Sequence, residues 1–183
     1  FEQTSTSSYP KALVLNYLEE SETDDPAVMQ RARDLLDKGY KRLVTFETQD
    51  KGYEWFGSSP PHEALTAYGL MQFADYQDVY GGVDQAMVDR TATWLKGRRD
   101  GKGGFKRNPK ALDSFGRASD NVSNAYIVWA LAEAGHRDIL PEAKAAHAAA
   151  LKNQDAYQLA LVANTFYLLN AQTRADPCAA SCT

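Results

Sequence analysis

Helical periodicity runs through almost the whole of this 183-residue chain, and it limits the possible folds more than any other feature. Apolar residues recur at intervals of three or four positions, as they do on one face of an α-helix. No segment alternates apolar and polar residues between hairpin turns, the pattern that is typical of a half-buried strand. The sequence therefore predicts an all-α protein.

Prolines, glycines and acidic residues divide the chain into about seven expected helices, with prolines near the helix starts and acidic residues at N-caps. By residue number these helices cover 9–18, 26–48, 62–78, 84–98, 120–134, 141–153 and 155–171. Ser7 or Ser8 is expected to cap the first helix and Asp24 or Asp25 the second. Residues 172–183 are expected to begin a further helix that is cut short.

Three of the expected helices are apolar nearly all the way round, which indicates an interior position, whereas the helices between them are amphipathic. The three apolar segments are 64–73, 123–131 and 161–169. Two similar elements, Asp50-Lys51-Gly52-Tyr53 and Lys102-Gly103-Gly104-Phe105, precede the first two segments at comparable distances. Repeated helical hairpins with inner and outer members predict either a solenoid or a closed α/α ring.

Composition and charge exclude several function classes. The 20 Lys and Arg residues against 24 Asp and Glu give a net charge of −4, without the basic stripe that phosphate-backbone binding requires, so nucleic acid is not an expected partner. No apolar run approaches the length of a membrane-spanning helix, and the first residues lack the pattern of a signal peptide. Cys178 and Cys182 cannot form a disulfide framework or a zinc site, and we expect two unpaired thiols.

The three histidines provide no metal site. His62 follows two prolines and His136 lies in a helix-ending loop, so both are expected to be solvated. His147 lies in an alanine-rich helix with no Glu or Cys ligand three or four positions away. The sequence also contains no glycine-rich phosphate loop and no nucleophile elbow, so neither a metal nor a cofactor is expected.

Glu54, Asp113 and Asp120 lie in segments where a general acid or base could act, because α/α rings can hold paired carboxylates. Asp120 is explained equally well as the cap of the helix that follows it. A set of aromatic residues fits either the core or a pocket for a sugar or an isoprenoid. Its members are Tyr53, Trp55, Phe56, Trp94, Trp129 and Phe166. Spacing alone leaves these alternatives open.

The order and spacing of several short motifs resemble the thioester-containing domain of the alpha-macroglobulin and complement family over about residues 1–170. These motifs are Glu2-Gln3, Gly39-Tyr40-Lys41-Arg42-Leu43, Lys51-Gly52-Tyr53-Glu54-Trp55-Phe56-Gly57, Leu65-Thr66-Ala67-Tyr68, Thr93-Trp94-Leu95, Gly103-Gly104-Phe105 and Ala125-Tyr126-Ile127. The stretches Phe1-Glu2-Gln3-Thr4 and Asp113-Ser114-Phe115-Gly116-Arg117 are most similar to the bacterial members. The resemblance implies an α/α toroid. Residues 1–183 would form a single, truncated toroid domain, an open ring whose exposed apolar seams favour self-association.

In that family a Cys-x-Glu-Gln motif forms a thioester between the Cys sulfur and the Gln side-chain carbonyl, with loss of ammonia. The resemblance assigns residues 1–8 to the remnant of this motif, with Glu2 as its Glu and Gln3 as the acyl partner. The Cys would immediately precede Phe1, so this chain alone is expected to be unreactive. Complement-type members carry a reactivity-tuning His near residues 110–115, where Asp113 is the acid-base group of this chain.

The resemblance therefore implies a bacterial alpha-macroglobulin-like protease inhibitor in the periplasm or at the cell surface, without enzymatic turnover. Its partners would be proteases, trapped covalently through their amines, and the other domains of the parent protein. Two alternatives stay open: a toroid enzyme of the terpenoid-cyclase or prenyltransferase type, and a repeat domain without a thioester that only binds proteins. The residue before Phe1 in the parent separates the first interpretation from the last.

Overall fold

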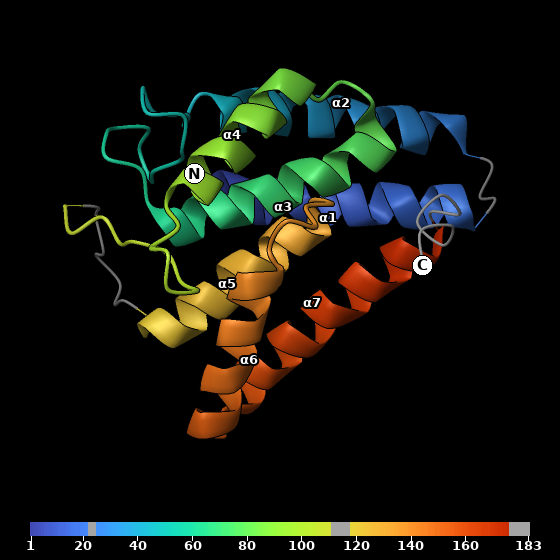
Figure 1. Ribbon diagram of the computed structural model, residues 1–183. Coiled ribbons are helices and arrows are strands. Elements are labelled where there is room, and N and C mark those ends of the chain that lie inside the picture. Colours follow the sequence, from blue (N-terminus) through green and yellow to red (C-terminus); the bar gives the residue numbers. More distant parts are fainter. Residues whose placement is uncertain (22–24, 111–117, 176–183) are drawn as a thin grey trace. The chain divides into compact units, whose positions relative to one another are not determined.

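The computed structural model describes residues 1–21, 25–110 and 118–175, and every regular element in these ranges is an α-helix (Figure 1). The helices are α1 (Glu2–Glu20), α2 (Pro26–Val44), α3 (Glu63–Tyr80), α4 (Gln85–Gly97), α5 (Asp120–Glu133), α6 (Leu140–Asn153) and α7 (Ala156–Ala175). The chain divides into two compact units. Unit 1 comprises Phe1–Gly97 and Arg107–Asp113, and unit 2 comprises Arg98–Lys106 and Ser114–Thr183. The predicted all-α class is confirmed, with seven helices in the described ranges.

Helix α1 begins at Glu2, whereas the hydroxyl-rich segment predicts a start near Tyr9. Serine and threonine favour N-caps, but inside a helix their hydroxyls can also donate to carbonyls one turn back. Thr6 donates to the Glu2 carbonyl at 3.0 Å in this way, and Ser8 donates to the Thr4 carbonyl at 2.7 Å. The predicted cap at Ser7 or Ser8 is therefore wrong. The motif segment 1–8 forms the N-cap and the first two turns of α1.

In unit 1, α1 packs against α2 and α3, and α3 also packs against α4 (Figure 1). The periodicity predicts one apolar stripe on the first helix, made of Leu13, Tyr17 and Leu18, but Leu13 and Tyr17 are 55% and 67% exposed, so this stripe is not the buried face. The buried residues of α1 are Ser5, Ser8, Ala12 and Leu15. Gly39 of α2 lies so close to Ser8 that there is no room for a Cβ at that position.

Three helix starts show which side chains cap them. Asp25 accepts hydrogen bonds from two backbone N–H groups in the first turn of α2, both at 3.1 Å, as predicted. The Nδ1 atom of His62 accepts from a backbone N–H of α3 at 3.2 Å, and this ring is buried, so the prediction of a solvated His62 is wrong. Ser119 caps α5 at 3.4 Å in place of Asp120. A cap needs an acceptor one residue before the helix, and Asp120 is already its first residue.

The two glycine-aromatic elements form the same kind of turn, once in each unit. An isolated antiparallel bridge pairs Glu47 with Tyr53 in unit 1, and a second pairs Arg99 with Phe105 in unit 2. Each bridge spans the same number of residues. Inside each turn, the carbonyl of the residue before the aromatic accepts a backbone N–H, at 2.8 Å in unit 1 and 2.9 Å in unit 2.

The glycine in each turn lies against the helix that follows. A Cβ on Gly52 would lie 3.0 Å from the Thr66 hydroxyl oxygen of α3, and a Cβ on Gly104 would lie 2.8 Å from the Asn124 amide nitrogen of α5. The backbone N–H of the next aromatic residue donates to the same side chain, at 2.8 Å for Thr66 and 3.2 Å for Asn124. Glycine is required here because of this close approach.

The residue that opens each bridge forms an ion pair with the next amphipathic helix, and the two charges are exchanged between the units. In unit 1, Arg90 of α4 contacts both carboxylate oxygens of Glu47, at 2.6 and 2.8 Å. In unit 2, the Nε atom of Arg99 lies 3.0 Å from a carboxylate oxygen of Glu142 in α6. Both pairs join residues at the same sequence distance. The units therefore repeat one arrangement of turn and helix.

In unit 2, α5, α6 and α7 pack against one another. Ala125, Ala146, Leu161 and Val162 form a buried apolar cluster, against which Tyr126, Trp129 and Phe166 pack. His147 of α6 is exposed, with its ring edge-on to Phe166 at 5.8 Å. Residues 172–175 belong to α7. The rest of the expected further helix, 176–183 with Cys178 and Cys182, lies outside the described residues.

Candidate functional site

Phe1, where the motif segment begins, is part of the core of unit 1 and is 5% exposed. Its ring packs against those of Phe46, Tyr53 and Tyr68, with centroid distances of 6.0, 5.2 and 6.4 Å. Its backbone nitrogen donates a hydrogen bond to the Trp55 carbonyl at 2.6 Å. These contacts fix the start of α1 to the loop that follows the first bridge.

The side chains of Glu2 and Gln3 are exposed on the first turn of α1. On the opposite, buried face, the Ser5 hydroxyl donates to the side-chain oxygen of Gln72, whose amide donates to the Tyr76 hydroxyl. A buried polar network is stable only when all of its members are paired. The hydrogen bond between Ser5 and Gln72 therefore fixes the register of α1 on α3. Gln3 is therefore presented to solvent by a helix whose other face is held in place.

The loop after Tyr53 encloses a small hollow. Glu54 is 5% exposed, and its Oε2 atom accepts from the backbone N–H groups of Phe56 at 2.8 Å and Ser58 at 3.2 Å. A hollow of about 250 Å³ opens beside this carboxylate. Its lining residues are Glu54, Phe56, Ser58, Ser59, Pro60 and Lys110. The Phe56 ring is 77% exposed.

Two fully buried phenols lie in the core of unit 1. Burial raises the pKa of Tyr53 and of Tyr76, so both phenols stay neutral at physiological pH. These tyrosines serve as packing and hydrogen-bonding groups and not as acids or bases.

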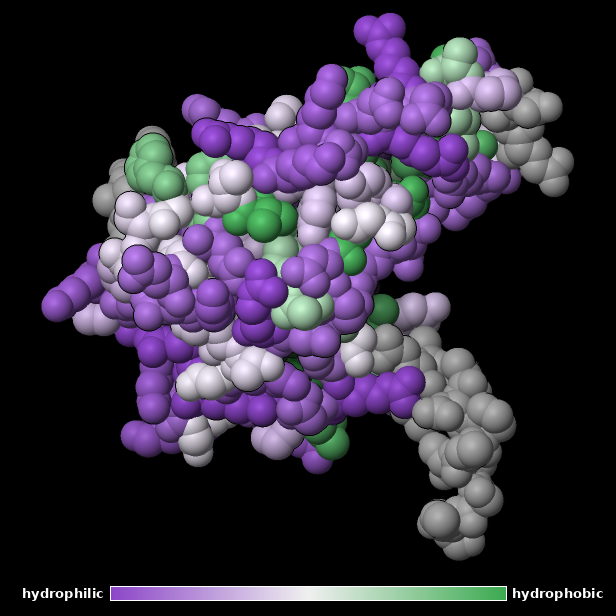
Figure 2. All heavy atoms as spheres, turned by 90° about the horizontal axis from the view of Figure 1, so that it is seen from above, coloured by the Kyte–Doolittle hydropathy of each residue, from purple (hydrophilic) through white to green (hydrophobic). Residues whose placement is uncertain are grey.

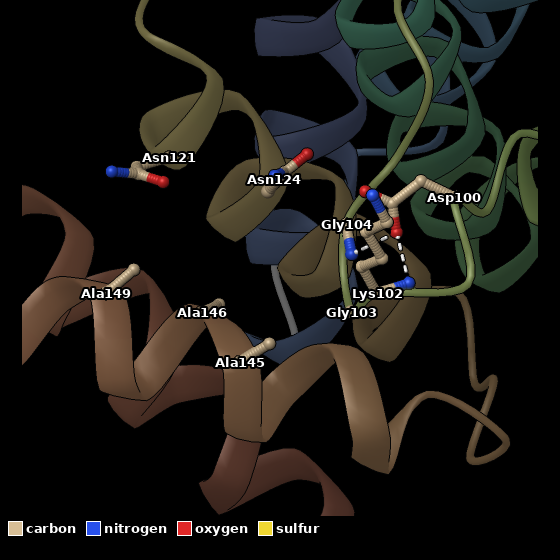
Figure 3. Close-up of a pocket in the computed structure, with 9 residues that line it drawn as sticks. All are labelled: Asp100, Lys102, Gly103, Gly104, Asn121, Asn124, Ala145, Ala146 and Ala149. Atoms are coloured by element: carbon tan, nitrogen blue, oxygen red, sulfur yellow. Dashed lines mark hydrogen bonds between the residues drawn. The ribbon is translucent and has the colours of Figure 1, made fainter.

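A second hollow, of about 210 Å³, lies in unit 2 beside the repeated turn (Figure 3). Asn121 and Asn124 project from α5, and alanines line the hollow from α6 (Figure 3). Asp100 accepts from the backbone N–H groups of Lys102 at 2.7 Å and Gly104 at 2.9 Å. These hydrogen bonds lower the pKa of the Asp100 carboxyl, which the turn itself uses as an acceptor.

The three carboxylates considered for acid-base chemistry have different positions. Glu54 holds the loop at residues 56–58, and Asp120 is the exposed first residue of α5 in unit 2. Asp113 lies outside the described residues. Of the aromatic candidates, Tyr53 is fully buried and Phe56 is exposed. Trp129 and Phe166 pack on the core of unit 2, as core residues do.

Among residues 1–21, 25–110 and 118–175, no group of three or more His, Cys, Asp and Glu side chains is arranged to hold a metal ion. No helix of the described part is both long and apolar enough to cross a membrane.

Sequence reasoning missed two features beside Gln3: the Trp55 carbonyl and the network of Ser5, Gln72 and Tyr76. A backbone acceptor leaves no trace in the residue types. Gln72 does leave one, because a glutamine in a helix that is otherwise apolar all round needs a buried partner. That signal predicts a polar contact but does not identify Ser5 as the partner.

Residues 1–181 match the A-macroglobulin TED domain, where TED stands for thioester-containing domain. The chain belongs to this family. Two alleles of thioester-containing protein 1 from Anopheles gambiae, S3 and S1, are each 27% identical to it over 173 residues. The match covers 91% of this chain and 12% of each mosquito protein, so the chain spans about one eighth of their length.

Membership of the family supports several of the predictions in their general form. The TED domain is a non-enzymatic domain, which confirms the prediction that the chain is not an enzyme and argues against a toroid enzyme. Proteins of the macroglobulin family are generally secreted or extracellular.

Proposed function

We propose that this domain belongs to a bacterial alpha-macroglobulin-like protease inhibitor. In the intact protein, Gln3 forms a thioester with a Cys that immediately precedes Phe1. The inhibitor acts in the periplasm or on the cell surface and binds captured proteases covalently. We assign the chain to the α/α toroid class of TED domains.

The position of Phe1 is the observation that supports this proposal best. Its nitrogen, held at the Trp55 carbonyl, fixes the place of a residue bonded to it, and Gln3 is exposed on the first turn of α1. The Cys precedes the N-cap residue Phe1, and Gln3 is the second residue of α1. The thioester therefore forms at the exposed start of α1 in this proposal.

The chemistry requires only the two side chains. The Cys sulfur bonds to the side-chain carbonyl carbon of Gln3, the C–N bond of that amide breaks, and ammonia leaves. A protease amine later attacks the same carbon, the C–S bond breaks, and the sulfur takes up the proton that the amine loses. The product is an amide between Gln3 and the protease, together with a free thiol. Shielding from water preserves the thioester until that step.

Primary amines are the preferred acceptors in this proposal. The segment 105–119 contains no histidine, so no imidazole is available there to attack the thioester and release a thiolate. Asp113 is the acid-base residue proposed to tune the reactivity in its place. Faster labelling of the intact protein by glycerol than by methylamine would contradict this preference.

Capture of a protease by the full-length protein tests the function. Incubation with a serine protease is expected to produce a covalent band that survives boiling in detergent. The band should be absent in Gln3→Ala and after pretreatment with methylamine. A thioester-bearing wild type that forms no such band, or a Gln3→Ala variant that still forms it, would overturn the trapping proposal.

A further inference from the structure

The hollow beside Glu54 adjoins the place where the proposed thioester would lie. The Phe1 nitrogen donates to the Trp55 carbonyl, and Glu54 and Phe56 flank Trp55 in the chain. Consecutive Cα atoms are about 3.8 Å apart, so a Cys bonded to Phe1 lies beside this loop. Anything held in the hollow is therefore close to the Cys that the proposed function places before Phe1.

Glu54 gives the hollow a fixed negative charge. Two backbone N–H groups hold its Oε2 atom, and the side chain is 95% removed from solvent, so the carboxylate has one position. A cation that enters the hollow is therefore stabilised by the carboxylate of Glu54, which lines it.

The other walls suit the end of a flexible aliphatic chain. Phe56 and Pro60 provide apolar surface, and Ser58 and Ser59 contribute hydroxyl groups. The volume of about 250 Å³ is sufficient for a few methylene groups and an ammonium. Lys110, which is exposed, contributes the one basic side chain of the lining.

We propose that this hollow is the acceptor subsite of the domain, where Glu54 binds the ammonium end of a lysine side chain from the attacking protein. The inference rests on the proposed function. The bound ammonium loses one proton to water, and the resulting amine attacks the acyl carbon of Gln3. A new C–N bond forms, the C–S bond breaks, and the second proton passes to the sulfur. Glu54 acts by positioning the nucleophile and forms no covalent bond.

The test compares a cationic with an uncharged nucleophile on the full-length protein. Methylamine is an ammonium ion at neutral pH, whereas hydroxylamine is uncharged. The rate of thioester cleavage by methylamine divided by the rate with hydroxylamine, both at low concentration, therefore reports the charge of the subsite. Glu54→Gln is expected to lower this ratio about fivefold, the value of one partly solvated ion pair. Asp50→Asn removes an exposed carboxylate of the preceding turn and should leave the ratio unchanged.

A second variant covers the case in which Glu54→Gln disturbs the loop. Lys110→Glu changes an exposed residue and makes the hollow more acidic, so it should raise the ratio. The hydroxylamine rate shows whether the thioester of each variant is intact. An unchanged ratio in both variants overturns the subsite while leaving the thioester in place. A wild-type mass with no loss of ammonia overturns the thioester and the subsite together.

Discussion

Phe1 connects the reactive motif to the core of unit 1. Its ring lies among three other aromatic rings, and its nitrogen is bonded to the loop that contains Glu54. Gln3, two residues later, is exposed. The position of an exposed reactive side chain thus depends on the packing of a buried apolar neighbour.

Replacing Phe1 by alanine is therefore expected to lower the free energy of unfolding by about 3–5 kcal/mol, because it leaves a cavity between aromatic rings. Urea denaturation followed by circular dichroism measures the change. Phe56→Ala is the matched control and should change stability by about 0.5 kcal/mol or less, because that ring is 77% exposed. Equal effects of the two substitutions would contradict this account of Phe1.

Asp100 gives a prediction about pH. Backbone hydrogen bonds from Lys102 and Gly104 hold its pKa in the folded state below the ordinary value of 3.8. The pKa of Asp100 is lower in the folded state than in the unfolded state, so the ionised carboxylate stabilises the fold. This stabilisation is complete well above pH 3.8 and is lost as the pH falls through the folded-state pKa. Asp100→Asn should therefore destabilise the protein at about pH 7 and have a smaller effect at about pH 3. A penalty in urea unfolding that is the same at both pH values would disagree with this mechanism.

Single residues show where prediction from sequence ends. The local preferences of the residue types predict a cap at Ser7 or Ser8 and a solvated ring at His62, and both predictions are wrong. A serine hydroxyl can cap a helix or bond within it, and the choice here depends on the burial of Phe1, a tertiary contact. Gln3 was located only through the resemblance of the motif.

The repeated element of this fold is a glycine-aromatic turn followed by one apolar helix and one amphipathic helix. A bridge, a close glycine and an ion pair occur in the same order in both units. The two ion pairs carry their charges in opposite order, and only the pair in unit 1 involves both carboxylate oxygens. This exchange indicates that the repeat requires opposite charges at the two positions and tolerates either order.

Reversing the charges in unit 1 tests that interpretation. Glu47→Arg places two guanidinium groups together and should lower the free energy of unfolding, and adding Arg90→Glu should restore most of the loss. The coupling expected from a double-mutant cycle in urea is about 1 kcal/mol, because the pair is partly exposed. The more exposed pair of Lys41 and Asp37 within α2 should give a smaller coupling. No coupling between Glu47 and Arg90 would show that their contact is incidental.

Elements were predicted better than residues. Most helices begin and end within a few residues of the expected positions, because apolar periodicity and turn residues are local signals. The similar sequences of the two glycine-aromatic elements also predict similar turns, and the two bridges confirm this. The sequence did not reveal the exchanged ion pairs, since residues far apart along the chain carry no mark of their contact.

The whole molecule leaves several large apolar side chains exposed on α1 and α2. They are Leu13, Val14, Tyr17, Val28 and Leu35. Hydrophilic residues predominate on the face shown in Figure 2, with hydrophobic residues scattered among them. Apolar side chains that lie one helical turn apart, as Leu13 and Tyr17 do, form a continuous stripe that favours association.

We therefore expect the isolated chain to self-associate as its concentration rises, and the double substitution Leu13→Lys with Tyr17→Lys to weaken that association. Light scattering over a concentration series measures both. Lys38→Glu, at an exposed position of α2, serves as a control for an ordinary surface change. A wild-type chain that stays monomeric and binds no hydrophobic dye would contradict the expectation of open apolar seams.

The central claim concerns the whole protein, because the thioester needs a Cys before Phe1 and shielding by its surroundings. The most direct test is the intact mass of the full-length protein, before and after methylamine. The account predicts a starting mass that is short by one ammonia, an increase equal to one methylamine, and the appearance of one thiol, with the label on Gln3. A full starting mass that methylamine does not change would contradict it.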